Sequence, residues 1–414
     1  MLQSVDVGTK ALKDYHPIVG GETIEKIRAL AEPLKGATVV HVNATAFGGG
    51  VAEMLPTLVP LMRDLGLDAH WQVIEGTDDF FDVTKAMHNG LQGMAIPFTA
   101  EMQQTWQRYN ELNAEKFEGR YDFVVVHDPQ PAGLLRYTAG ENGRHWIWRC
   151  HIDTSLPNPD YWGFLAPYID EYPAAVFTME QYVGPGVDPK HLALIAPTID
   201  PLSPKNAAMT AATADAIVRD YGLDVGRPLL VQVSRFDPWK DPLGVIDAYR
   251  IVKERIPGVQ LALVGSMASD DPEGWDYYDK TVRHAGEDYD IRILHNFQGV
   301  GGREVNAFQT AADVVIQKSI REGFGLTVTE AMWKRKPVIG GEVGGIPLQI
   351  IDGETGFLVG SVEECADRVL HLLEHPIEAD RMGQAGREHI RNHYLSPHHL
   401  ADYLQLFNQL LAKS

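Results

Sequence analysis

Two glutamates, Glu322 and Glu330, flank a stretch with glycines at positions 323 and 325, directly after an aliphatic run typical of a buried strand. The glycines permit a tight backbone that a side chain would block, and a helix expected from about Leu326 would direct its unpaired N–H groups toward this loop. Glu322 would lie at the reacting end, whereas Glu330, further into the helix, could accept hydrogen bonds from the vicinal hydroxyls of a ribose. The spacing predicts a nucleotide-sugar site, with two surface glutamates as the alternative.

A glycine run at residues 48–50 follows a strand expected to end near Asn43 and precedes a helix expected to start near Val51. Its backbone N–H groups can approach a phosphate at the positive end of that helix. The run is not the dinucleotide-binding fingerprint, because Glu53 occupies the third glycine position, and it lacks the Gly-Lys-Ser/Thr ending of a Walker A loop. Phosphate or sugar contact and a plain tight turn both remain open.

Arg235 and Lys240 follow the strand expected at the start of the second half, in the segment "VSRFDPWKDP". A forked guanidinium and a compact ammonium at a strand end suit the negative charges of a diphosphate. Solvated surface charges are the alternative, since loops commonly carry basic residues.

His151 and Asp153 lie just beyond another expected strand, and His127, Asp128 and Gln130 follow a third one. Ligands of open α/β sheets bind at the carboxyl ends of the strands, so these side chains could hydrogen-bond a sugar. Each also has a plainer explanation, such as a structural histidine or, for Asp128, the N-cap of a helix.

No spacing of residues predicts a metal site, and the His-Glu-x-x-His motif is absent. Asp288 and Asp290 form the Asp-x-Asp pattern used for metal-bound diphosphates, but they precede a strand instead of following one, so we expect a solvated turn. The aromatic segment 157–172 is interpreted as core or lid packing in preference to a carbohydrate platform.

The elements that position these residues alternate along the whole chain between short aliphatic runs and longer segments with helical periodicity. The expected strands are "ATVVHV", "HWQVIE", "FVVVH", "HWIWRC", "AAVFTM" and "LALIA", then "PLLVQVS", "VQLALVG", "IRILH", "ADVVIQ", "KPVIG" and "GFLV". This alternation predicts the α/β class, with two doubly wound, Rossmann-like domains that face a cleft. The proline-rich segment 196–206 predicts a boundary near Ser203, hence domains at residues 1–203 and 204–394, with a helix at about 395–414 that could pack back on the first.

The composition excludes several classes of protein. A formal net charge of -20 over 414 residues argues against nucleic acid or an anionic membrane surface as the main partner. Only Cys150 and Cys365 occur, so neither a disulfide framework nor a cysteine-rich metal cluster is expected, and a reducing, cytoplasmic setting fits. The first residues lack a secretory signal pattern, and no apolar run approaches the ~18 residues of a membrane span.

Taken together, these motifs resemble the retaining family 4 glycosyltransferases of GT-B architecture. The segments "HVNATAFGGGVAEML", "VVHDPQPA", "WRCHIDTSLPNP", "VSRFDPWKDP" and "SIREGFGLTVTEAMW" are similar, more closely, to trehalose glycosyltransferring synthases. The resemblance implies transfer of glucose from a nucleoside diphosphate (NDP) glucose to free glucose, which gives α,α-trehalose and NDP in a reversible reaction. It also implies a homodimer, stimulation by magnesium without a dedicated metal site, and no tightly bound cofactor.

The resemblance further implies roles for individual residues. An acceptor-side first domain and a nucleotide-sugar-binding second domain are expected. The residues implied in catalysis are Arg235, Lys240, Glu322 and His151. The residues implied in donor binding are Gly48, Gly49, Gly50, Arg235, Lys240, Glu322, Gly323, Phe324, Gly325, Leu326, Thr327 and Glu330. The residues implied in acceptor binding are Asp153, Asn43 and Asp128.

No residue is a convincing nucleophile for the two-carboxylate scheme of retaining glycosidases. We therefore favour same-face attack, in which the acceptor hydroxyl gives its proton to the departing phosphate oxygen. His151 would hydrogen-bond the transferred glucose, and Glu322 its 3- and 4-hydroxyls. Two alternatives remain open: a trehalose phosphorylase that uses phosphate, and a non-catalytic nucleotide-sugar sensor. A nicotinamide oxidoreductase is disfavoured by Glu53.

Overall fold

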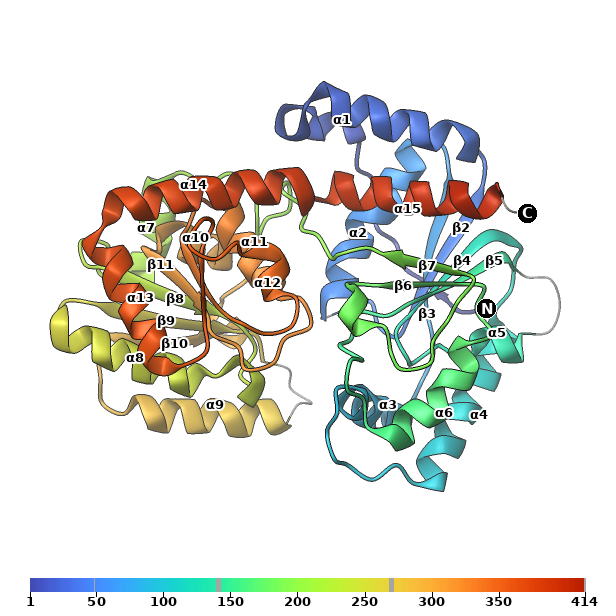
Figure 1. Ribbon diagram of the computed structural model, residues 1–414, viewed down its shortest axis with the longest axis horizontal. Coiled ribbons are helices and arrows are strands. Elements are labelled where there is room, and N and C mark those ends of the chain that lie inside the picture. The colour runs from blue at the N-terminus through green and yellow to red at the C-terminus, as the bar shows by residue number, and fades with distance from the viewer. Residues whose placement is uncertain (48, 139–142, 268–271, 413–414) are drawn as a thin grey trace. The chain divides into compact units, whose positions relative to one another are not determined.

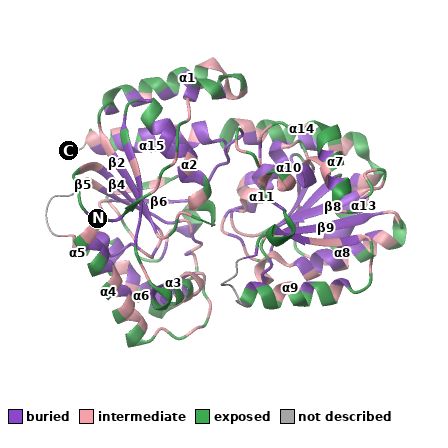
Figure 2. Ribbon diagram, turned by 180° about the vertical axis from the view of Figure 1, so that it is seen from behind, coloured by how far each residue is buried: buried purple, intermediate pink, exposed green. Residues whose placement is uncertain are grey.

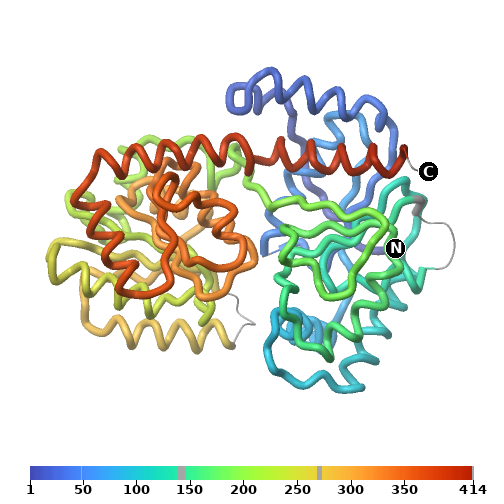
Figure 3. Tube along the Cα trace, viewed as in Figure 1, coloured from blue at the N-terminus to red at the C-terminus, as the bar shows by residue number. Residues whose placement is uncertain are grey.

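The computed structural model describes residues 1–47, 49–138, 143–267 and 272–412 of the chain (Figure 1). These residues form two compact units: Met1–Thr198 with Ser396–Ser414, and Ile199–Leu395. The chain leaves the first unit after Thr198, slightly earlier than the boundary near Ser203 that the prolines suggest. The colours of the tube in Figure 3 show that the last segment returns to the unit that contains the first residues. None of the described helices is both long enough and apolar enough to span a membrane.

The first unit is built around one sheet. Its strands are β1 (Gln3–Ser4), β2 (Thr38–Asn43), β3 (Asp68–Val73), β4 (Tyr121–His127), β5 (Gly143–Arg149), β6 (Ala174–Phe177) and β7 (His191–Leu194). They are ordered β1-β3-β2-β4-β5-β6-β7. The short β1 pairs antiparallel with β3, and the other pairings of this sheet are parallel. Helices cover both faces of the sheet, which explains the unbroken aliphatic sequences of its central strands.

The final helix belongs to this first unit. The helices of the first unit are α1 (His16–Ala31), α2 (Gly49–Asp64), α3 (Asp78–Leu91), α4 (Ala100–Lys116), α5 (Leu134–Tyr137), α6 (Pro159–Ile169) and α15 (Ser396–Leu411), with 3-10 turns η1 (Leu12–Tyr15), η2 (Glu32–Leu34) and η3 (Glu180–Tyr182). α15 packs on α1 and α2. Asn408 Nδ2 donates to the Leu30 carbonyl at 2.8 Å, and the Phe407 ring stacks on Phe123 of β4 at 4.2 Å between centroids. The apolar face of α15 thus completes one face of the core.

The second unit contains a six-stranded parallel sheet. Its strands are β8 (Leu229–Val233), β9 (Gln260–Gly265), β10 (Ile291–His295), β11 (Val314–Gln317), β12 (Val338–Gly341) and β13 (Phe357–Val359), in the order β10-β9-β8-β11-β12-β13. The order reverses between β8 and β11, which is where sheets of this kind bind ligands beyond the strand ends. Figure 2 shows the strands buried between exposed helix faces in both units.

The helices of the second unit precede, connect or follow these parallel strands. They are α7 (Ala211–Asp220), α8 (Pro242–Arg255), α9 (Pro272–Ala285), α10 (Gly302–Ala311), α11 (Leu326–Trp333), α12 (Ile346–Gln349), α13 (Val362–Glu374) and α14 (Pro376–His393), with 3-10 turns η4 (Pro238–Lys240) and η5 (Asn296–Gln298). Both units are therefore doubly wound α/β structures, which confirms the predicted fold class.

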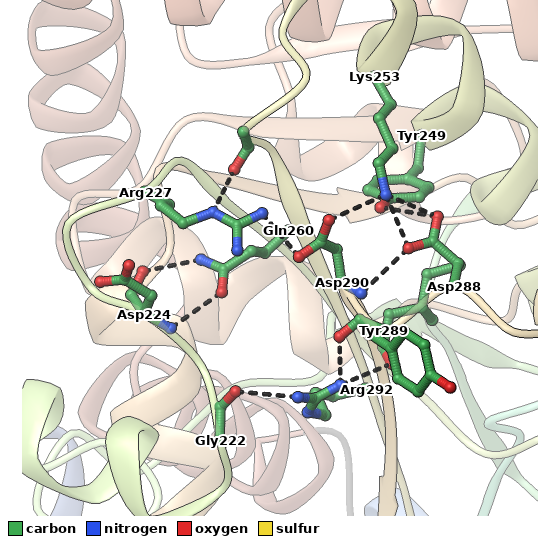
Figure 4. Close-up of polar contacts among 12 residues, drawn as sticks. Gly222, Asp224, Arg227, Tyr249, Lys253, Gln260, Asp288, Tyr289, Asp290 and Arg292 are labelled. Carbon is green, nitrogen blue, oxygen red and sulfur yellow. Dashed lines mark hydrogen bonds and ion pairs between the residues drawn. The ribbon is translucent and has the colours of Figure 1, made fainter.

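The Asp-x-Asp pair lies at the opposite edge of this second sheet, before β10. Lys253 Nζ contacts Asp288 at 2.7 Å and Asp290 at 2.9 Å, and Arg227 Nη2 contacts Asp290 at 2.7 Å (Figure 4). The carboxylates are about a quarter exposed. The pair therefore lies in a partly exposed turn, as expected, and an ion-pair network already supplies cations to both carboxylates at the start of β10.

Candidate active site

Lys240 ends the short η4 turn that follows β8. Asp237 caps this turn, because its Oδ1 accepts hydrogen bonds from the backbone N–H groups of Trp239 at 2.9 Å and Lys240 at 3.1 Å. From the strand, Gln232 Nε2 donates to the Lys240 carbonyl at 2.7 Å. The local sequence Asp-Pro-Trp-Lys thereby holds the lysine at the carboxyl end of β8.

Lys240 forms an ion pair with Glu322, the first glutamate of the pair that the sequence singled out. Nζ lies 2.6 Å from Oε2, and the two side chains are only 17% and 9% exposed. Ser319 Oγ donates to the same carboxylate oxygen at 3.2 Å. The Ile320 N–H donates to the Trp239 carbonyl at 2.8 Å, which ties the loop after β11 to the turn after β8. The structure therefore brings Lys240 and Glu322 together, although they are far apart in sequence.

A second ion pair lies beside the first. It joins Lys318, which precedes Ser319, to Asp241, which follows Lys240. Lys318 Nζ contacts Asp241 Oδ2, and the lysine side chain is 7% exposed. Asp241 also caps α8 by accepting the Gly244 N–H at 3.1 Å, and its φ of 49° is left-handed. Sequence reasoning missed this pair. Its signal was a lysine directly after a buried strand, where a charge needs a partner.

The loop after Glu322 enters α11 through Gly325. This glycine has a φ of 83°, in the left-handed region that other residues adopt at a cost. Phe324 is buried beside it, and Leu326 and Thr327 begin the helix. The first turn of a helix has N–H groups without intrahelical partners and carries the positive end of the helix dipole. This predicted anion-binding terminus therefore lies in the same loop as Glu322.

Gln349 of α12 holds the loop between Glu322 and α11 by hydrogen bonds, and this role was not predicted from the sequence. Its fully buried amide Nε2 donates to the Phe324 carbonyl, while its Oε1 accepts from Thr329 Oγ1. The Gly345 N–H donates to the Gly323 carbonyl at 3.1 Å. A single glutamine inside a helical pattern carries no signal of such a role, because the partners come from another element.

Glu330, the second glutamate, is 1% exposed inside α11. Its Oε1 lies 3.2 Å from Lys205 Nζ, and its Oε2 has no hydrogen-bond partner within the described ranges. Lys334 Nζ donates to the Glu330 carbonyl at 3.2 Å and to Asn206 Oδ1 at 3.0 Å. Burial lowers the pKa of Lys334 to about 7, against the opposing effect of Glu330. The alternative of a surface glutamate is wrong for Glu330, which keeps one carboxylate oxygen for a further donor.

Arg235 differs from Lys240 in its surroundings. Its side chain is 68% exposed, and its Nη2 lies 3.5 Å from Asp237 Oδ2, too long for a strong hydrogen bond. The guanidinium therefore extends from the end of β8 into solvent and is held loosely.

In the first unit, Asp128 and His151 are joined at the ends of β4 and β5. Asp128 has a left-handed φ of 65°, and its Oδ1 accepts the His151 N–H at 2.7 Å. Its own N–H donates to the Arg149 carbonyl at 2.8 Å. Burial raises the pKa of Asp128 to about 7. The N-cap alternative is wrong, because Gly133 precedes α5. The His127 ring contacts His151 as well.

Asn43 makes hydrogen bonds to β3 and to the loop that follows β2, and Asp153 makes hydrogen bonds within its own loop. Asn43 Oδ1 accepts from Trp71 Nε1 and its Nδ2 donates to the Thr45 carbonyl, both at 2.7 Å. Asp153 Oδ1 accepts from the Ser155 N–H at 3.0 Å and from its hydroxyl at 2.6 Å. Both side chains therefore shape the loops that follow β2 and β5.

The glycine run begins α2. Gly48 lies outside the described residues. Gly49 has a left-handed φ of 78°, and Gly50 follows it into the helix; both are exposed. A residue with a side chain would be strained at Gly49, and the backbone there is open to a ligand.

The second unit thus offers a cation, a carboxylate and a helix terminus at one strand-end edge, while the first offers a histidine, a near-neutral aspartic acid and a glycine-led helix. Cations and helix termini stabilise negative charge on a leaving phosphate. Within the described parts of the chain, no group of three or more His, Cys, Asp or Glu side chains could hold a metal ion.

Comparison with known proteins identifies both halves. Residues 41–184 match the family model "Trehalose synthase, N-terminal domain", and residues 214–389 match "Glycosyl transferases group 1". A trehalose synthase of Rubrobacter xylanophilus is 54% identical over 99% of this chain and 100% of its own. A trehalose phosphorylase of Grifola frondosa is 28% identical over 94% of this chain and 60% of its own.

Among solved structures, a UDP-forming α,α-trehalose-phosphate synthase of Burkholderia xenovorans in complex with glucose-6-phosphate superimposes with a TM-score of 0.73. It is 14% identical, with 91% of this chain and 100% of the other covered. This likeness concerns the fold, and with the group 1 match it confirms the predicted GT-B class.

Proposed function

We propose the following function from the premise that this chain belongs to the trehalose synthase family of glycosyltransferases. The protein is a retaining hexosyltransferase that transfers glucose from an NDP-glucose to free glucose, with α,α-trehalose and NDP as products, and the reaction is reversible. The same premise supports a cytoplasmic location and a homodimer. The molecular mass in solution tests the homodimer. The proposed site rests above all on one observation, the partly buried ion pair of Lys240 with Glu322 in the loop that leads to α11.

The second unit would bind the donor diphosphate. Lys240 Nζ and the N–H groups at Leu326 and Thr327 offer positive charge and dipoles to the β-phosphate. Arg235 is exposed and loosely held, so it can move onto the phosphates when they bind. Glu322 holds Lys240 in place before the nucleotide sugar binds, and its carboxylate is proposed to accept hydrogen bonds from the 3- and 4-hydroxyls of the glucose.

The reaction would proceed on one face of the sugar. The bond from the anomeric carbon to the phosphate oxygen breaks, the acceptor's anomeric oxygen forms the new bond, and the acceptor proton passes to the departing phosphate. Negative charge therefore collects on the phosphate, where Lys240, Arg235 and the α11 terminus stabilise it. Gly49 and Gly50 at the start of α2 are proposed as a further contact to phosphate or sugar.

The first unit would contact the sugars. His151 is proposed to hydrogen-bond the transferred glucose, and Asp128 to assist the acceptor. Because burial raises the pKa of Asp128 to about 7, this carboxyl can be protonated near neutrality and can then donate as well as accept. Asn43 and Asp153 are proposed to act through the loops they hold together.

Product analysis tests the proposed function. We expect trehalose and NDP when the protein is incubated with UDP-, ADP- or GDP-glucose and free glucose, and NDP-glucose when trehalose and NDP are supplied. Trehalose formed only from glucose 1-phosphate would identify a phosphorylase instead. Tight binding of the donor without NDP release would identify a sensor and overturn the proposal.

The proposed ribose contact of Glu330 leads to a separate expectation. Glu330→Gln should raise the donor KM by about tenfold with kcat nearly unchanged, because a ribose hydrogen bond is present in both ground and transition states. Glu330 Oε2, which has no hydrogen-bond partner among the residues that the structure describes, is the atom that would accept from the ribose hydroxyl. Initial rates against donor concentration measure the effect. A fall in kcat with normal KM would contradict the assignment.

Lys205→Met is the companion variant. It removes the cation that contacts Glu330 Oε1. We expect lower thermal stability, because a buried carboxylate would lose its cation, and we still expect a larger change in the donor KM than in kcat.

A further inference from the structure

Three imidazoles form a chain across the first sheet. His41 Nδ1 lies 3.0 Å from His127 Nε2, and His127 Nδ1 lies 3.0 Å from His151 Nε2. They come from three neighbouring strands, since His41 is on β2, His127 ends β4 and His151 follows β5. His41 and His127 are fully buried, whereas His151 is half-buried. The chain therefore leads from the core to a proposed sugar contact.

All three rings are neutral at physiological pH. Burial lowers the pKa of His41 to about 3, and it lowers the pKa values of His127 and His151 well below the usual value. The nearby Arg149 guanidinium acts in the same direction on His127 and His151. His399 of α15 lies close as well, and its own pKa is lowered by burial to about 3.

Neutral imidazoles in a chain constrain one another. Each carries one donor and one acceptor nitrogen, so the protons of the chain must all point the same way. They point either toward His151, which leaves its Nδ1–H free to donate, or toward His41, which leaves His151 Nδ1 as a bare acceptor.

The buried end of the chain decides between these patterns. His41 Nε2 has no hydrogen-bond partner within the described residues. If the protons pointed toward His41, this atom would be a buried N–H without an acceptor, whereas the other pattern leaves only a bare lone pair. Orphaned buried N–H groups are the rarer of the two in proteins. The Tyr403 ring packs against the His41 ring in a T-shaped arrangement, with 5.7 Å between centroids.

We propose that His127 and His41 are positioning residues that hold His151 as the Nδ1–H tautomer, so that its ring donates a hydrogen bond to an oxygen of the transferred glucose. The role of His151 rests on the proposed function, whereas the tautomer does not. The chain is not a proton exit, because His41 Nε2 has no described group to pass a proton to. The three histidines instead fix the hydrogen-bond donor, His151 Nδ1–H, before the sugar binds.

Two substitutions at His41 separate this role from plain packing. His41→Asn keeps a side-chain N–H near the position of Nδ1, and His41→Leu removes it while filling a similar volume. We expect His41→Leu to lower kcat by about tenfold, the rate equivalent of one ordinary hydrogen bond, with NDP affinity unchanged. His41→Asn should recover most of this loss. Thermal denaturation shows whether each variant is folded.

The tautomer is read directly from ring ¹⁵N shifts of the ¹⁵N-histidine-labelled protein, with His151→Asn used for assignment. We expect a protonated Nδ1 and a hydrogen-bonded, unprotonated Nε2 for His151 in the wild-type protein. In His41→Leu this preference should weaken. An Nε2–H tautomer of His151 in the wild-type protein, or an unchanged kcat and tautomer in folded His41→Leu, would overturn the proposal. Failure of trehalose synthesis would instead refute the proposed function and leave the shifts interpretable.

Discussion

Lys240→Ala is expected to lower kcat by about 10²- to 10³-fold, the usual effect of removing one preorganised donor from a developing oxyanion. Among the described residues proposed to bind the phosphate, Lys240 carries a cation that is partly buried and already held in place. Gln232 and Asp237 hold its backbone, and Glu322 holds its Nζ. Its contribution should grow as charge moves onto the phosphate. The loss should therefore appear in kcat more than in the donor KM. Steady-state rates with NDP-glucose and glucose measure it.

Two controls make this result specific. Arg303→Ala removes an exposed cation from α10 in the same unit and should leave kcat within a factor of about two, as expected for a surface charge. Lys240→Ala combined with Glu322→Gln also removes the buried carboxylate charge that loses its Lys240 partner in the single variant. If the double variant regains thermal stability but not rate, the loss belongs to the phosphate contact. Near-normal kcat in folded Lys240→Ala would refute the diphosphate assignment.

The strands were predictable from sequence because buried strands consist of unbroken runs of aliphatic residues. The six runs expected in the second half correspond to β8 through β13. In the first half the expected runs correspond to β2 through β7, and of the strands in the described residues β1 alone was not expected. That strand has two residues and pairs at the edge of the sheet, so burial imposes no pattern on it.

The candidate site was predictable to the extent that it depends on local backbone. Glycine at a left-handed position, followed directly by a helix, places Gly325 and the α11 terminus without knowledge of distant residues. The identity of the partner was not predictable for the pairs of Lys318 with Asp241 and of Glu330 with Lys205, because the members of each pair are far apart in sequence. The same is true of the three histidines, which are ordinary core or loop residues until the sheet places their strands side by side.

Gly341 at the end of β12 supports the loop that carries Glu322, and Gly341→Ala should disrupt it. A Cβ at this position would lie 2.1 Å from the Ser319 carbonyl oxygen and 3.2 Å from the Ser319 nitrogen. Both atoms belong to backbone, so no side-chain rotation relieves the overlap. The loop must move, and with it Ser319 Oγ and the Glu322 carboxylate to which it donates. We expect a loss of about 1–3 kcal/mol in the free energy of unfolding, as for other overpacked sites.

The same displacement should lower kcat/KM for the donor by about 10²-fold, since an error of about 1 Å in a positioned group has that order of effect. Gly258→Ala is the matched control, because a Cβ there meets open space in the same unit and both quantities should stay near wild type. Thermal denaturation and initial rates measure the two losses. A folded Gly341→Ala enzyme with normal kcat/KM would show that the position of the Ser319 to Glu322 loop does not limit the reaction. In that case Lys240 and the α11 terminus would have to hold the phosphate without the carboxylate between them.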